Sequence, residues 1–127
     1  MRESEGQLFG FERLEVWHKA VAFASSVYKS TASFPRAEQF GLAMQLRRAS
    51  VSVAANIAEG ASRASGKDQA RFFEIAFGSL NEIATMLHIA LGQAFIKDDE
   101  FARMRSEISD MGRMLSGLKR VALARRS

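Results

Sequence analysis

Two histidines are the first residues of this 127-residue sequence that suggest chemistry. His18 stands three residues after Glu15, and Glu-x-x-His is the spacing with which helix bundles bind a di-iron centre. Such a centre needs a second motif of the same kind. The segment predicted below to form a helix at about 67–96 offers only Glu82 followed by Thr85. His88 falls near an apolar stripe, which is typical of a partly buried or interface histidine. We therefore predict no metal site.

Other common reactions lack their signatures in this sequence. Cysteine is absent, so there is no thiolate nucleophile and no cysteine-ligated zinc. Two histidines without a nucleophile motif do not build a hydrolytic triad. The Gly66-Lys67 pair lacks the preceding strand and the glycine spacing of a phosphate-binding P-loop. We expect a protein that is not an enzyme and carries no cofactor.

Positive charge gathers at the C-terminal end of the chain, within a net charge of +4. After Met111 no acidic residue follows, and the basic residues are Arg113, Lys119, Arg120, Arg125 and Arg126. These side chains could contact the phosphates of DNA or RNA. They could equally be a solvated helix end, where cations interact favourably with the helix dipole. Both interpretations stay open at this point.

Apolar residues recur at spacings of three and four, which predicts four helices at about 13–32, 36–61, 67–96 and 98–125 after a flexible N-terminus, 1–12. The breaks between these helices fall at Phe34-Pro35, Gly60 and Lys97. Ser65 or Asp68 could cap the third helix, and Asp98 or Asp99 could cap the fourth. The predicted core stripes are Leu14, Trp17, Val21, Ala24, Tyr28 and Thr31; Leu42, Leu46, Ala49, Val53 and Ile57; Phe73, Phe77, Leu80, Ala84, Leu87, Leu91 and Ala94; and Phe101, Met104, Ile108, Met111, Leu115, Leu118 and Ala122. Short connections between such helices predict one all-α domain, an antiparallel up-down four-helix bundle.

Targeting signals are missing from the sequence. The first ten residues are polar and acidic rather than a signal peptide. No stretch reaches the roughly 18 apolar residues that span a bilayer. We expect a cytoplasmic protein with no membrane segment.

The second and third helices carry more apolar residues than one bundle can bury. The surplus lies off the core stripes, at Val51, Ala54, Ala55, Ala58 and Ala61 and at Phe72, Ile75, Met86 and Ile89. Exposed together, these residues would form a larger apolar patch than monomers usually show. We expect another subunit to cover both helices. The alternative is a slightly wide core stripe.

A motif on the second helix resembles that of a known family. It comprises Gln45-Leu46-Arg47-Arg48-Ala49, Ser52, Asn56-Ile57-Ala58-Glu59-Gly60 and Arg63, with Phe72, Ala76, Gly78-Ser79-Leu80 and Glu82 fitting on the third helix. The pattern is similar to that of the four-helix-bundle proteins also called 23S rRNA intervening-sequence proteins. The resemblance covers about Leu14 to Phe95, and beyond Lys97 it rests only on the helical pattern.

The resemblance implies a fold and an assembly more clearly than a function. Members form ring-shaped homopentamers, and some are encoded inside insertions in large-subunit ribosomal RNA genes. A related branch, the accessory protein of diversity-generating retroelements, is basic, binds nucleic acid and partners a reverse transcriptase. The function hypothesis is therefore a nucleic-acid-binding or ribonucleoprotein accessory module that acts through basic surface residues. The alternative is a protein-interaction scaffold with no role at nucleic acid.

The polar residues of the motif are interpreted as structural. They are Gln45, Arg47, Arg48, Ser52, Asn56, Glu59, Arg63 and Glu82, and several of them form a stripe beside the apolar stripe of the second helix. We predict that Arg47 or Arg48 pairs with Glu59 or Glu82 of a neighbouring helix or subunit.

Overall fold

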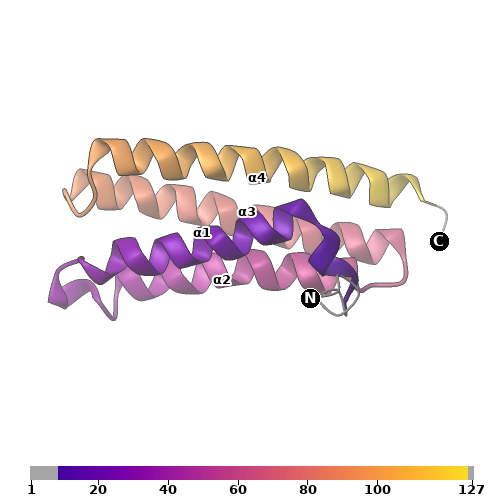
Figure 1. Cartoon of the computed structure of the whole chain (residues 1–127), viewed down its shortest axis with the longest axis horizontal. Helices are drawn as coiled ribbons and strands as arrows, with labels where there is room; N and C mark the ends of the chain where they lie inside the picture. The colour runs from indigo at the N-terminus through magenta and orange to yellow at the C-terminus, as the bar shows by residue number, and fades with distance from the viewer. Residues whose placement is uncertain (1–8, 126–127) are drawn as a thin grey trace, which may run out of the picture.

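The computed structural model describes residues 9–125 and consists of four long helices with two short 3-10 helices. In chain order these are η2 (Gly10–Arg13), α1 (Glu15–Ala32), η3 (Arg36–Glu38), α2 (Leu42–Ala61), α3 (Gly66–Gly92) and α4 (Asp98–Ala124). Figure 1 shows α1 joined to α2 and α3 joined to α4 at one end, and α2 joined to α3 at the other. The predicted four-helix, all-α fold is confirmed.

Each helix packs against the next one along the chain, and α1 closes the bundle with a looser contact to α4. In the described part of the chain no Cα atom of α2 lies within 8 Å of one of α4, so the two helices occupy opposite corners. Surfaces centred on α2 and on α4 therefore face in opposite directions. This arrangement lets one bundle display two different surfaces.

The core stripes predicted for α2 and α4 are confirmed. Leu46, Ala49, Val53 and Ile57 of α2 are buried, as are Met104, Ile108, Met111, Leu115 and Ala122 of α4. On α3 the buried set shifts slightly, because Ala70, Ala76, Ile83 and Met86 join Phe73, Leu80 and Leu87 in the core. Predicted core residue Ala94 is instead exposed, in the turn that follows α3, with a left-handed φ of 61°.

The stripe predicted for α1 is largely wrong: only Thr31 is fully buried, Leu14 and Trp17 pack partly buried against the core, and Val21 and Tyr28 are exposed. The residues of α1 that enter the core are Val16, Ala20, Phe23, Val27 and Thr31. The predicted stripe of Trp17, Val21, Ala24 and Tyr28 lies on the outward side, where Val21 is 40% exposed and Tyr28 is 50% exposed. Helix α1 thus carries two apolar stripes about 100° apart. Packing buries the stripe through Phe23, whereas the spacing of apolar residues predicted the stripe through Val21.

Helix α3 is the most apolar element of the bundle. By length and composition it could cross a membrane, contrary to the sequence expectation. In this structure it packs between α2 and α4 and buries nine of its residues in the bundle. Burial in the bundle accounts for part of this apolar composition, since Ile75 and Ile89 are exposed.

Helix ends differ from prediction in several places: α2 begins at Leu42, after η3, rather than at 36, and α3 ends at Gly92 rather than at 96. Ser65 caps α3, since its hydroxyl accepts from the N–H of Asp68 at 3.1 Å. Neither Asp98 nor Asp99 is the N-cap of α4; Lys97 holds that position, and both acids stand in the first turn, where they favour the helix dipole. Of the predicted flexible N-terminus, residues 1–8 lie outside the described residues, while residues 10–13 form η2.

Two glycines permit close contact between helices. A Cβ at Gly60 would lie 2.9 Å from the ring of buried Phe73, and a Cβ at Gly66 would overlap the carbonyl oxygen of Ala122 on α4. By contrast, nothing lies within 4 Å of a Cβ built at Gly78. Gly78 therefore makes no close contact with another helix of the same chain.

Candidate nucleic-acid interface

A groove between α3 and α4 concentrates cationic side chains. It has a volume of about 680 Å³, and its α4 wall carries Arg105, Ser109, Arg113, Ser116 and Arg120. These five residues follow one another at spacings of four, four, three and four, so they form one row along the helix. We call them the arginine–serine row. The opposite wall is formed by Phe77, Asn81 and Ala84 of α3.

The electrostatics of this groove are one-sided. Three arginines and no carboxylate line it. Among the described residues Arg105 and Arg120 have no hydrogen-bond or ion-pair partner. Arg113 pairs with Asp110 one turn back, and both side chains are exposed enough for water to weaken that pair. The row therefore presents guanidinium groups that are free to bind an anion.

The five cations predicted from the sequence do not act as one group. Arg113 and Arg120 belong to the row. Lys119 points into a neighbouring depression and pairs with Glu74 at 3.1 Å, and Arg125 donates to Gln69 at the end of the bundle. Arg126 lies outside the described residues. The prediction missed Arg105, which precedes the acid-free stretch but shares the helical spacing of Arg113 and Arg120.

The opposite side of the bundle is apolar. A second groove, of about 610 Å³, runs between α1 and α2 and is lined mainly by Trp17, Val21, Ala24 and Tyr28 together with Val51, Ala54, Ala55 and Ala58. We call it the α1–α2 apolar groove. Across α2 the surface continues to Ile75 and Ile89 of α3, which are 42% and 50% exposed. Four of the five surplus apolar residues expected on α2 line this groove, Ala61 lines a separate depression beside Leu118, and Met86 is in the core.

Residue Arg47 of the polar motif has a structural role at the α1–α2 connection. Its Nε donates to the Thr31 hydroxyl at 2.8 Å and its Nη2 to the Gln39 side chain at 3.2 Å. Its guanidinium also lies 5.4 Å from the Tyr28 ring centre. Gln39 in turn donates to the carbonyls of Thr31 and Phe34, so Arg47 holds the connection closed.

Other motif residues hold α2 against α3. Ser52 bonds Ser79 across the two helices at 3.1 Å, and Asn56 donates to Ser52. Near the α2–α3 turn Glu59 pairs with Arg63, whose guanidinium stacks 4.7 Å from the Phe72 ring centre. These contacts agree with a structural interpretation of the motif.

The predicted pairing of Arg47 or Arg48 with Glu59 or Glu82 is wrong within one chain. Arg47 contacts Thr31 and Gln39 instead, and Glu59 pairs with Arg63 of the turn that follows α2. Arg48, Glu82 and Gln45 are exposed. Pairing of Arg48 with Glu82 between subunits stays a prediction.

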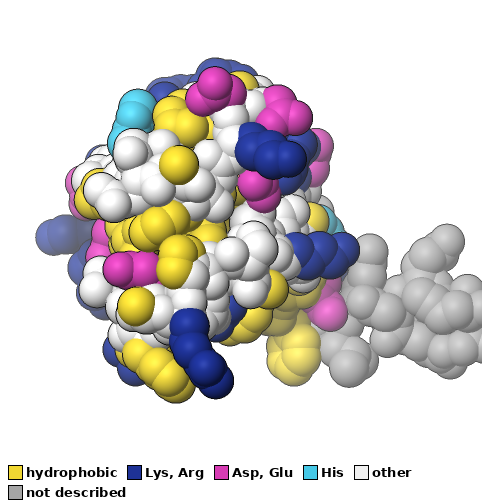
Figure 2. All heavy atoms as spheres, turned by 90° about the vertical axis from the view of Figure 1, so that its left-hand side faces the viewer, with side chains coloured by type: hydrophobic (Ala, Val, Ile, Leu, Met, Phe, Trp, Pro, Cys, Tyr) yellow, Lys and Arg dark blue, Asp and Glu magenta, His cyan; other side chains and the backbone are white. Residues whose placement is uncertain are grey.

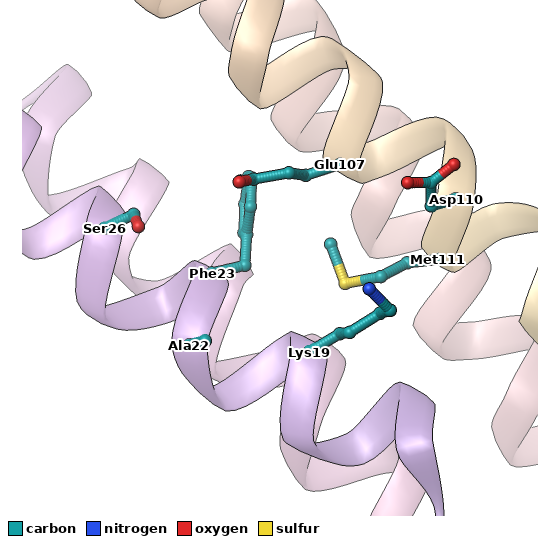
Figure 3. Close-up of a pocket in the computed structure, with 7 residues that line it drawn as sticks. All are labelled: Lys19, Ala22, Phe23, Ser26, Glu107, Asp110 and Met111. Carbon is teal, nitrogen blue, oxygen red and sulfur yellow. The ribbon is translucent and has the colours of Figure 1, made fainter.

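A small crevice of about 180 Å³ lies where α1 and α4 meet loosely. Figure 3 shows Lys19 of α1 reaching toward Met111, with Glu107 beside Phe23 and Asp110 on the next turn of α4. Two carboxylates face a single lysine here, so this crevice favours an anion far less than the α3–α4 groove does. One oxygen of Glu107 is shielded from water without a hydrogen-bond partner.

The two histidines have separate environments. His18 bonds the backbone carbonyl of Glu12 at 2.8 Å and contacts Trp17, so it fastens η2 to α1. His88 is exposed, which excludes the partly buried position within one chain and leaves the interface position a prediction, and its ring packs edge-on against Phe101 with 4.8 Å between ring centres. In the part of the chain that the structure describes, no three histidine, aspartate or glutamate side chains converge as metal ligands would.

Charge at the α1–α2 and α3–α4 connections is mixed. Figure 2 looks at this end of the bundle and shows Lys or Arg and Asp or Glu side chains around its rim, with apolar side chains between them. The one-sided charge is thus a property of the α3–α4 groove and not of the whole surface.

These features define a class: a small four-helix bundle whose distinctive chemistry lies on its outer faces rather than in an enclosed pocket. The chain belongs to the 23S rRNA-intervening sequence protein family, whose model matches residues 12–117. The resemblance drawn from the second and third helices is confirmed, and the match extends into α4.

A solved structure shows the same fold. It is that of a protein of unknown function from the S23 ribosomal protein family of Bacteroides thetaiotaomicron. The two chains are 21% identical, the match covers 82% of this chain and 97% of that one, and the TM-score is 0.74. No curated protein matches this chain.

Proposed function

We propose that this protein is a non-enzymatic, cytoplasmic nucleic-acid-binding module, an antiparallel bundle that works as a ring-shaped homopentamer. The observation that carries the proposal is the α3–α4 groove with three arginines and no carboxylate. Arginine and serine are side chains that commonly contact phosphate oxygens. Contacts to phosphate would make binding tolerant of sequence and steeply dependent on salt.

Self-association is the second part of the proposal, and its support is the α1–α2 apolar groove with Ile75 and Ile89 beside it. A second copy is the occupant we favour because Arg48 and Glu82, of opposite charge, are both exposed on α2 and α3, the helices that also carry Val51, Ile75 and Ile89. Since α2 and α4 occupy opposite corners, contacts centred on α2 would leave the arginine–serine row open. Several rows in one ring would add weak contacts together.

Removal of the three arginines is expected to abolish most nucleic-acid binding. The variant R105Q/R113Q/R120Q should bind RNA or DNA of about 20 nucleotides roughly 100-fold or more weakly at about 50 mM salt, because three phosphate contacts are lost. Fluorescence anisotropy measures this change. The variant R36Q/K67Q/K97Q removes equal charge from exposed residues at the bundle ends and should change affinity only a few-fold. Equal losses in both variants, or no binding by the unmodified protein at low salt, would contradict the proposal.

A single charge on the apolar surface should dissociate the oligomer. In V51D a carboxylate stands on α2 at a position that is 46% exposed in one chain, so the bundle should fold while subunit contacts are lost. Light scattering coupled to size exclusion should report a monomer. The control V121D places the same charge on α4, at a residue 64% exposed, and should keep the mass of the unmodified protein. A V51D variant with unchanged mass would argue for a different interface.

A scaffold that binds only proteins, including a reverse transcriptase, remains the alternative function. The α1–α2 apolar groove could bind another protein as well as a second copy of this chain. Normal oligomerisation without any nucleic-acid binding is the outcome that favours this alternative.

A further inference from the structure

The spacing of the arginine–serine row bears on the form of nucleic acid that the groove accepts. With a helix rise of about 1.5 Å per residue, successive members of the row stand about 5 to 6 Å apart along α4. This is close to the separation of successive phosphates along one strand. The whole row, from Arg105 to Arg120, covers about 22 Å. Five neighbouring phosphates could each meet one side chain of the row.

The row is also straight, because it runs along one side of a single continuous helix (Figure 1). A strand in a duplex winds around its axis, so only a few consecutive phosphates can stay beside a straight helix. An extended single strand has no such restriction. The straight row therefore fits a single strand along its full length and a duplex along only part of it.

The other wall of the groove offers partners for bases. Asn81 and Phe77 line it on α3, and His88 follows at the same helical spacing beyond Ala84. Asn81 is exposed and carries both hydrogen-bond donors and an acceptor. His88 is exposed with its ring held by Phe101 at 4.8 Å, so a base could stack on the ring. The bases of a duplex are paired and stacked in its interior, so they could not contact this wall of the groove.

We infer that the α3–α4 groove binds an extended single strand of about five nucleotides, with the phosphates on α4 and the bases toward Asn81 and His88 of α3. The inference rests on the proposed nucleic-acid-binding function and specifies its ligand. The sugar is not recognised by the row, because arginine and serine contact phosphate in RNA and DNA alike.

The test compares single strands with a duplex of the same length. Oligouridine, oligothymidine and a DNA duplex, each about 12 nucleotides long, are titrated against the full-length protein at low salt by fluorescence anisotropy. Both single strands should bind about tenfold more tightly than the duplex, with a salt slope near −2 for three ionic contacts to a single strand. Equal or tighter binding of the duplex overturns this inference and leaves the proposed function intact. A preference of more than tenfold between uridine and thymidine strands also overturns it. If none of the three binds, the proposed function itself fails.

Two variants locate the strand without removing charge from the row. H88A should weaken single-strand binding several-fold and leave weak duplex binding unchanged, because it removes a stacking surface. S109A/S116A should weaken single-strand binding several-fold and duplex binding by a smaller factor, because a duplex meets only part of the row. S106A, an exposed serine of α4 that does not line the groove, is the matched control and should bind normally. Loss of duplex and single-strand binding by the same factor in either variant would contradict this placement.

Discussion

Replacing Gly66 with alanine is expected to lower the free energy of unfolding by about 3 kcal/mol, the upper range for adding one methyl group to a close-packed contact. The new Cβ would overlap the backbone carbonyl oxygen of Ala122, and a backbone atom cannot rotate away as a side chain can. Either the start of α3 or the last turn of α4 has to move. Urea denaturation followed by circular dichroism measures the loss.

Gly78 provides the matched control, since it receives the same substitution in the same helix. A Cβ there meets nothing within 4 Å, and alanine is a better helix former than glycine. G78A should therefore raise stability by up to about 1 kcal/mol. Hydrogen exchange at residues 119–124 should increase in G66A only. A G66A protein as stable as the unmodified protein would show that α4 does not approach Gly66 closely in solution.

Replacing Arg47 with alanine is expected to lower the free energy of unfolding by about 2 to 3 kcal/mol. The change removes two hydrogen bonds from a charged donor, to Thr31 and Gln39, and a contact with the Tyr28 ring. Hydrogen bonds to charged groups contribute about 1.5 to 3 kcal/mol, and a buried partner left unsatisfied adds to the loss. Buried Thr31 would lose the donor to its hydroxyl oxygen, although that hydroxyl would still donate to the Val27 carbonyl at 2.7 Å.

The neighbouring residue supplies the control for Arg47. Arg48 is exposed, so R48A should change the stability of the subunit by less than about 0.5 kcal/mol. R47K should recover only part of the loss, because one ammonium group cannot reproduce the forked geometry of a guanidinium. All variants need the same protomer concentration, since self-association shifts apparent stability. Equal effects of R47A and R48A would contradict the assignment of Arg47 to the connection.

The motif that identifies the family and the groove proposed to bind nucleic acid are separate parts of the molecule. Arg47, Ser52 and Asn56 support the packing of α2 on its neighbours, on the side of the bundle opposite α4. The arginine–serine row instead lies on α4, where the sequence resemblance rested on helical pattern alone. Membership of the family therefore establishes the fold but does not by itself predict the row.

The sequence by itself determined the four helices and the core stripes of α2 and α4, and it narrowed the cap of α3 to Ser65 or Asp68, because these features depend on residues within a few turns of one another. Tertiary structure alone decided which apolar stripe of α1 faces inward, since the stripes through Phe23 and through Val21 are both apolar and only contact with α2 and α4 fixes the rotation of the helix. It also decided which cations act together. Arg105, Arg113 and Arg120 share a groove because α3 supplies its other wall, whereas Lys119 is drawn to Glu74, 45 residues earlier in the chain. The periodicity of apolar residues depends on the sequence of one helix alone. The residues that bury its side chains or form ion pairs with them come from other parts of the chain.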